Sequence, residues 1–202
     1  MSAAVTFDAF SGHTAFCTPQ TSRHELDLRA SLDFELNRIN EEARYRKTTS
    51  PAHAIQLGDY LFIGPYPTEE TVQYLVQHGV EVVINCCAGE RPTEPEIRRL
   101  FHVKDIAAVD SNEYFILMHN LDEFAHTVAM AKHAMKKVFV HCVAGVNRSA
   151  VLCAAYLMKV NHWGPVEVVR HFRQCGKLCL LENEAFRHQL VSEYLASMRG
   201  EN

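Results

Sequence analysis

Apolar residues recur along the chain in short runs separated by longer stretches with helical spacing. Runs rich in Val, Ile and Phe predict strands near residues 60–63, 80–85, 103–107 and 138–141. The stretches between them predict helices near 69–78, 121–135, 149–161, 165–175 and 184–198. Gly79 ends the first of these helices and Pro165 opens the fourth. Strands alternating with helices indicate an α/β fold, with a central, mostly parallel sheet of four to five strands flanked by helices.

A separate amphipathic pattern precedes these elements. It starts at Ser22, a predicted N-cap, and runs to Arg46 with apolar residues at helical spacing: Leu28, Leu32, Leu36, Ile39 and Ala43. Residues 1–20 show no periodic pattern. We therefore expect residues 1–50 to be an N-terminal extension with an amphipathic helix at 22–46, and residues 51–200 to form the main domain. We expect this helix to pack on the main domain; the alternative is an element that docks a partner.

The segment from His141 to Ser149 places several reactive residue types between a predicted strand and a predicted helix. Backbone N–H groups at a helix N-terminus lack partners and can converge on an anion. Arg148 can bind two phosphate oxygens at once, and Gly145 lets the backbone curl around the anion. The segment thus predicts a phosphate-binding loop made of Val143, Ala144, Gly145, Val146, Asn147 and Arg148.

The same surroundings act on Cys142, which follows the predicted strand. Thiols at helix N-termini beside a cation lose their proton readily. We therefore expect Cys142 to be a thiolate nucleophile at neutral pH, with the hydroxyl of Ser149 donating to its sulfur. The alternative, an ordinary buried cysteine, leaves the grouping of these residues unexplained.

These residues resemble the HCxxGxxR[ST] signature of the cysteine-dependent protein tyrosine phosphatase superfamily, most closely the small dual-specificity phosphatases. The resemblance extends over about residues 55–198. Residues 57–64 are similar to the family's opening strand, residues 75–85 to its helix and second strand, and residues 181–190 to its PNxxFxxQL segment, with Glu182 where Pro is usual. The resemblance implies a protein tyrosine phosphatase-like fold and identifies residues 51–200 as a phosphatase catalytic domain.

The resemblance also implies roles for residues outside the loop. Asp110 lies 32 residues before Cys142 (142 − 110), about where these phosphatases carry a general acid on a mobile loop, and a leaving oxygen needs such a proton. Asn183 lies in the PN-type segment, and His141 is expected to support the loop from a buried position.

Two adjacent cysteines, Cys86 and Cys87, end the second predicted strand. They resemble the position at which a lipid phosphatase relative keeps a cysteine that forms a disulfide with the nucleophile. Cys87 or Cys86 is therefore a candidate redox partner of Cys142, and the alternative is that both are small core residues.

Together these residues predict a phosphomonoesterase that acts on phosphotyrosine, and on phosphoserine or phosphothreonine, in proteins through a Cys-phosphate intermediate, with no metal or cofactor. One alternative is an RNA 5′-triphosphatase, because Asn147-Arg148 resembles part of the signature of that branch. Another is a phosphoinositide phosphatase, which the uncharged loop disfavours. A third is an inactive phosphate-binding module, which the presence of Cys142, Arg148 and Asp110 disfavours.

One departure from the family concerns a second phosphate on the substrate. Where relatives often have a basic pair before the PN-type segment, this chain has Gly176-Lys177. A second phosphate is therefore expected to be held by Lys177 alone or not at all.

Composition narrows the class of partner. A net charge of −4 at pH 7 disfavours general nucleic-acid binding. Seven cysteines without zinc-type CxxC pairs indicate a reducing compartment. The sequence shows neither an apolar window long enough to span a bilayer nor a readable secretory signal. We therefore expect phosphoprotein partners, no nucleic acid or membrane, and a cytoplasmic or nuclear location; the oligomeric state stays open.

Overall fold

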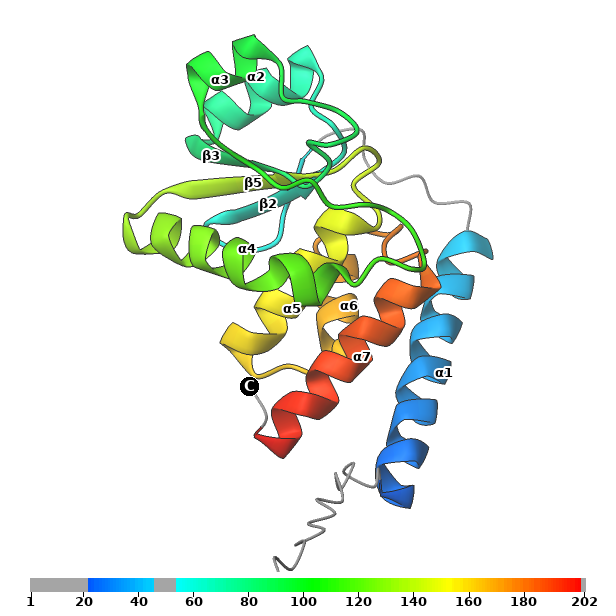
Figure 1. Ribbon diagram of the computed structural model, residues 1–202. Helices are drawn as coiled ribbons and strands as arrows, with labels where there is room; N and C mark the ends of the chain where they lie inside the picture. Colours follow the sequence, from blue (N-terminus) through cyan, green and yellow to red (C-terminus); the bar gives the residue numbers. More distant parts are fainter. Residues whose placement is uncertain (1–21, 46–53, 201–202) are drawn as a thin grey trace, which may run out of the picture.

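The computed structural model describes residues 22–45 and 54–200 (Figure 1). Its strands are β1 (Ile55–Gln56), β2 (Leu61–Gly64), β3 (Val80–Asn85), β4 (His102–Asp105) and β5 (Lys137–His141). Its helices are α1 (Arg23–Tyr45), α2 (Glu69–Gln77), α3 (Pro95–Leu100), α4 (Ile116–His133), α5 (Arg148–Asn161), α6 (Pro165–Gln174) and α7 (Glu184–Arg199).

The five strands form one sheet in the order β1-β2-β5-β3-β4. All neighbours pair in parallel except β1, which runs antiparallel to β2. The predicted α/β fold with a mostly parallel sheet is therefore confirmed. Because β5 lies between β2 and β3, its carboxyl end opens at the centre of one sheet edge. Ligands of open α/β sheets bind at that edge.

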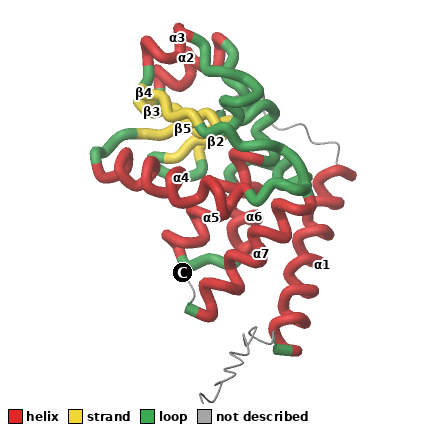
Figure 2. Tube along the Cα trace, in the orientation of Figure 1, coloured by secondary structure: helices red, strands yellow, loops and turns green. Residues whose placement is uncertain are grey.

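Helices cover both faces of the sheet (Figure 2), because the strands place apolar side chains alternately on either side. On one face Phe62, Val83 and Phe139 form a cluster with residues of α2 and α3. On the other, Ile63 and Val140 belong to a larger core shared with α4 to α7.

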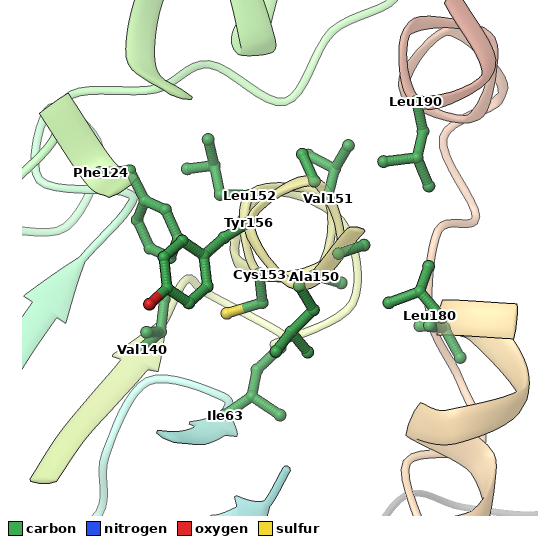
Figure 3. Packing of buried hydrophobic residues seen from close by; sticks show 14 of the residues in the cluster. Ile63, Phe124, Val140, Ala150, Val151, Leu152, Cys153, Tyr156, Leu180 and Leu190 are labelled. Carbon is green, nitrogen blue, oxygen red and sulfur yellow. The ribbon is translucent and has the colours of Figure 1, made fainter. Parts of the chain in front are cut away.

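Helix α5 lies at the centre of the larger core. Figure 3 shows it end-on, with Ile63 and Val140 of the sheet on one side, Phe124 of α4 beside them and Leu190 of α7 opposite. Every residue of α5 from Arg148 to Met158 is buried. The helix that begins at the predicted phosphate loop is therefore held on all sides, which fixes the position of its first turn.

The N-terminal helix α1 packs on α6 and α7. Its Leu36 and Ile39 are buried in the larger core, and Arg173 of α6 donates to the carbonyl oxygen of Ile39 at 2.5 Å. In addition, the Asn40 side chain donates to the carbonyl oxygen of Leu181 at 3.0 Å. The helix thus lies against the main domain. The boundary at residue 50 stays a prediction, and residues 1–20 lie outside the described residues.

Three local features differ from the sequence prediction. Helix α4 begins at Ile116, five residues before the expected start at 121, and the N–H of Leu117 in its first turn donates to Oε1 of Gln189 at 3.3 Å. This partner comes from α7, so no local pattern could reveal it. Strand β1 and helix α3, which has six residues, were not predicted because they are too short to show a period.

Candidate active site

The loop between β5 and α5 has the shape that its sequence predicts. Gly145 adopts φ +69°, a left-handed conformation that favours glycine. A Cβ at Gly145 would lie 2.5 Å from the carbonyl carbon and oxygen of Gly64 at the end of β2. A glycine at this position was expected because it lets the backbone curl around the anion. The structure adds a second reason, the close approach of the neighbouring strand.

Neighbouring segments hold the loop through its carbonyl groups. The N–H of Tyr66 donates to the carbonyl oxygen of Val143 at 3.0 Å, and the N–H of Leu181 donates to that of Val146 at 2.7 Å. Among the described residues, no backbone N–H from Val143 to Asn147 has an acceptor. These donors are therefore available to an anion, as an oxyanion site requires.

Cys142 lies at the base of this loop, with 1% of its surface exposed. The hydroxyl of Ser149 donates to the Cys142 sulfur at 3.3 Å, so the structure brings these two predicted residues together. A cavity of about 340 Å³ opens above the sulfur and is lined by Glu90, Asp110, Cys142, Val143, Ala144, Val146, Asn147 and Arg148.

The Arg148 guanidinium is almost fully buried beside this cavity. Its Nη1 donates to Oε2 of Glu90 at 2.7 Å and to the carbonyl oxygen of Ala108 at 3.3 Å. Burial opposes the charge, but Glu90 and the Cys142 thiol outweigh it and raise the pKa of Arg148. The buried Nε has no hydrogen-bond acceptor among the described residues. Buried donors are rarely left without a hydrogen bond, so Nε is suited to donate to an anion bound in the cavity.

Asp110 lies on the loop after β4, at the mouth of the cavity. The Asn147 amide donates to its two oxygens at 3.2 and 3.3 Å, and the Asn183 amide donates to Oδ1 at 3.1 Å. In turn, the N–H of Asn183 donates to Oδ1 of Asn147 at 3.0 Å. The two amides thus hold the carboxylate near Arg148, whose Nε lies 3.9 Å from Asp110 Oδ2.

His141, the last residue of β5, supports the loop from behind. Its ring is fully buried, with Nδ1 3.4 Å from the carbonyl oxygen of Cys142. It stacks on Phe139 and meets the edge of Tyr66. Burial lowers the pKa of His141 to about 4, so the ring is neutral at pH 7.

The candidate redox partners Cys86 and Cys87 are both fully buried. The Cys87 thiol donates to Oδ1 of Asn85 at 3.1 Å. Burial raises the pKa of Cys87 to about 11 and that of Cys86 well above its ordinary value, and the Cys142 thiol adds to both increases. Both thiols are thus protonated at neutral pH, which makes them slow nucleophiles. Their role as redox partners stays a prediction.

Glu90 was not predicted as a site residue, although it forms an ion pair with the buried Arg148. The position of Glu90 in the loop directly after β3 could have indicated its role. The carboxyl ends of parallel strands meet at one sheet edge, so an acidic residue there is a candidate neighbour of the phosphate loop.

Of the two expectations for a second phosphate, held by Lys177 alone or not at all, the structure favours the second. Lys177 has 1% of its surface exposed, and it does not line the cavity. Gly176, at φ +92°, reverses the chain after α6, and the lysine that follows is buried in the core.

Within residues 22–45 and 54–200, no three side chains of His, Cys, Asp or Glu are grouped in a way that could hold a metal ion. No helix in the same residues has the length and apolar character needed to cross a membrane.

Comparison with known proteins agrees with the family that the sequence resembles. Residues 61–194 match the family described as "Dual specificity phosphatase, catalytic domain". The chain is 25% identical to rat dual specificity protein phosphatase 26 over 196 residues, covering 94% of this chain and 91% of the rat protein. It is 30% identical to mouse dual specificity protein phosphatase 2, covering 68% of this chain and 42% of that protein. The match to tyrosine-protein phosphatase yvh1 of Schizosaccharomyces pombe is 28% identical and spans 59% of this chain but only 35% of the yeast protein.

Solved structures share the fold. Human tyrosine phosphatase-like serine/threonine/tyrosine-interacting protein superposes with a TM-score of 0.64 at 23% identity, covering 73% of this chain and 99% of that one. Human DUSP28(Y102H) gives 0.62 at 20% identity, with 75% of this chain and all of that one covered.

Proposed function

The chain belongs to the dual specificity phosphatase catalytic-domain family, and we propose that it hydrolyses phosphotyrosine, and phosphoserine or phosphothreonine, in protein substrates through a Cys142-phosphate intermediate. One observation carries the proposal. One cavity is lined by the Cys142 sulfur, by a run of backbone N–H groups without acceptors and by Arg148, whose Nε makes no hydrogen bond within the described residues. Such a site is complementary to the trigonal phosphoryl group as it passes from the ester oxygen to the sulfur.

In the first step, the Cys142 thiolate attacks phosphorus in line with the leaving oxygen. The S–P bond forms as the P–O bond to the substrate breaks, and Asp110 gives its proton to the leaving oxygen. The loop amides and Arg148 hold the three remaining phosphoryl oxygens, whose negative charge they stabilise.

In the second step, a water molecule attacks the phosphoryl group. The Asp110 carboxylate takes the water's proton, the S–P bond breaks and inorganic phosphate leaves. The electron pair returns to the Cys142 sulfur, and the hydroxyl of Ser149, 3.3 Å away, stabilises the thiolate that forms.

The charges of the cavity favour a phosphoprotein over the alternative substrates. Arg148 is the one cation among its lining residues, and Glu90 and Asp110 are carboxylates. An RNA 5′-triphosphate or a polyphosphorylated inositol carries more negative charge than one cation can balance. The seven cysteines of the chain support a reducing compartment, cytoplasmic or nuclear.

The test is a comparison of kcat/KM on phosphotyrosine peptides, phosphothreonine peptides, phosphoinositides and triphosphorylated RNA under one set of conditions. We expect the peptides to be the better substrates. Faster turnover of RNA or inositides would overturn the proposed substrate class. The control is Cys142→Ser, which should lose turnover yet still bind the phosphopeptide, because the loop and Arg148 remain. Near-normal turnover by this variant would refute the thiolate mechanism.

A further inference from the structure

The Asn147 side chain does not cap the helix that it begins. Asn147 is the N-cap residue of α5, and its carbonyl oxygen accepts from the N–H of Val151 at 2.9 Å. The side chain of an asparagine at this position commonly accepts a hydrogen bond from an N–H of the first helical turn. In α5 no such bond is made. The N–H groups of the first turn therefore stay open to an anion, and the side chain is available for other partners.

The Asn147 side chain instead joins two segments that are distant in the sequence. Its Nδ2 donates to both oxygens of Asp110, at 3.2 and 3.3 Å, and its Oδ1 accepts from the N–H of Asn183 at 3.0 Å. Both ends of the amide are matched, because an ionised carboxylate can only accept and a backbone N–H can only donate. These contacts fix the direction in which the amide points.

The Asp110 carboxylate ties the middle of its loop to the rest of the protein. The loop joins β4 to α4 and passes the N-terminus of α7 (Figure 1). It is held on either side at Ala108 and Tyr114, whose carbonyl oxygens accept hydrogen bonds from side chains of α5 and α7. Among the described residues, those at 109–113 form hydrogen bonds or ion pairs with other segments only through the Asp110 carboxylate. All of these residues except Ser111 are exposed, so packing adds little.

Among the described residues, three side chains contact this carboxylate, and Asn147 makes two of the hydrogen bonds. Asn183 Nδ2 supplies the third, at 3.1 Å, and Arg148 Nε lies 3.9 Å from Oδ2. In the proposed reaction Arg148 Nε donates to the phosphoryl group, so it does not hold the acid during turnover. The position of the acid then depends on the two amides, and mainly on Asn147.

We propose that Asn147 is a positioning residue whose side chain holds the general acid Asp110 over the cavity before the substrate binds. The inference rests on the proposed function for its purpose, since Asp110 matters as the donor to the leaving oxygen. The backbone N–H of Asn147 belongs to the phosphate loop, whereas its side chain acts on the acid. The family resemblance implies a mobile acid loop; in this chain the loop is already in place when the substrate arrives.

The first test follows the loop itself and does not depend on turnover. Hydrogen–deuterium exchange of residues 109–113 is measured by mass spectrometry in the wild type and in Asn147→Ala, each with and without inorganic phosphate. We expect exchange to be about tenfold faster in Asn147→Ala, because the middle of the loop loses two of its hydrogen bonds. In the wild type, saturating phosphate should change the exchange rate less than about twofold, since the loop is already held. Equal exchange in the two proteins would overturn the proposal, as would strong slowing by phosphate in the wild type, which would show a loop that closes on its ligand.

The second test separates positioning of the acid from a structural role. It compares kcat/KM on a phosphoserine peptide with kcat/KM on an activated aryl phosphate, which hardly needs a proton. We expect Asn147→Ala to lose about tenfold or more on the peptide and less than about threefold on the aryl phosphate. In the Asp110→Asn background, Asn147→Ala should cause little further loss on the peptide, because no acid remains to be positioned. Equal losses on both substrates, or losses that multiply with those of Asp110→Asn, would refute the positioning role.

The matched control is Asn161→Ala, which replaces an exposed asparagine at the other end of α5 and should change neither the exchange nor the kinetics. If Asn147→Ala does not fold, Asn147→Ser gives the same contrast, because its shorter side chain cannot contact both partners. Exchange is measured without turnover, so unchanged exchange would leave the phosphatase proposal standing. Conversely, a wild type that hydrolyses no phosphopeptide would still show whether Asn147 holds the loop.

Discussion

Arg148 donates from Nη1 to Oε2 of Glu90 at 2.7 Å. This bond and the one to the carbonyl oxygen of Ala108 both engage Nη1, while the buried Nε makes no hydrogen bond within the described residues and is available to donate to phosphate. Glu90 therefore sets the direction in which Arg148 presents its donors.

Replacing Glu90 should misalign the arginine. We expect Glu90→Ala to lower kcat/KM on a phosphotyrosine peptide about 10- to 100-fold, the cost of one charge-assisted hydrogen bond. Glu90→Gln, whose amide oxygen can still accept from Nη1, should retain more activity. Steady-state kinetics of both variants, with inhibition by inorganic phosphate, measure the effect. A gain of activity in Glu90→Ala would show instead that the carboxylate competes with the substrate for Arg148.

Replacing Asp110 should depend on the leaving group. Asp110→Asn keeps an oxygen that can accept from the Asn147 and Asn183 amides, but it has no proton to give. We expect a loss of about 100-fold or more on phosphoserine, whose alkoxide is a poor leaving group, and little loss on activated aryl phosphates. The measurement is kcat/KM across a series of leaving groups. Equal losses on both classes would assign the acid to another group, such as Glu113.

Gly145→Ala should damage both folding and activity. The φ of +69° and the 2.5 Å approach to the Gly64 backbone leave no room for a methyl group. We expect the free energy of unfolding to fall by about 2–4 kcal/mol and turnover to be lost as the loop opens. The matched control is Gly58→Ala, because a Cβ there meets nothing within 4 Å. Denaturant unfolding and kinetics on the two variants make the comparison, and equal stability of the two would contradict the predicted clash.

The buried His141 should make stability depend on pH. Its pKa is lowered to about 4 in the folded protein, from 6.5 when exposed. The unfolded chain therefore binds the proton first as pH falls, and stability present above pH 6.5 is lost between about pH 6.5 and 4. The expected loss is on the order of 3 kcal/mol. Unfolding free energies of the wild type and His141→Gln across this range test it: parallel pH profiles would mean that His141 does not contribute.

The candidate disulfide remains testable by oxidation. Peroxide converts the Cys142 thiolate to a sulfenic acid, and attack by the Cys87 sulfur would form an S–S bond and release water. We expect the wild type to regain activity with dithiothreitol after mild oxidation and Cys87→Ser to regain much less. Cys175→Ser, at the end of α6, is the control. Equal recovery in all three, with no Cys142 disulfide in a non-reducing peptide map, would make Cys87 a packing residue.

The sequence predicts the central strands β3 and β5 because their own residues carry the apolar pattern. The runs at 80–85 and 138–141 consist mostly of Val, Ile and Phe, as buried parallel strands do. The phosphate loop could be located for a similar reason, because its functional residues lie close together in the sequence, between Cys142 and Ser149.

What could not be predicted depends on contacts between distant segments. The early start of α4 rests on Gln189, 72 residues from Leu117, and the orientation of Arg148 rests on Glu90, 58 residues away. The burial of Lys177 depends on how the chain turns at Gly176. Nothing in the local pattern around these residues carries that information.

Asn40 links helix α1 to the segment that supports the phosphate loop. Asn40 donates to the carbonyl oxygen of Leu181, whose N–H donates to Val146. A chain trimmed to residues 61–194 would lose the first of these bonds, together with the buried Leu36 and Ile39. Rate constants measured on the trimmed chain would then describe a phosphate loop that lacks the support of helix α1. The smallest fragment that matches the family is thus shorter than the unit whose chemistry should be measured.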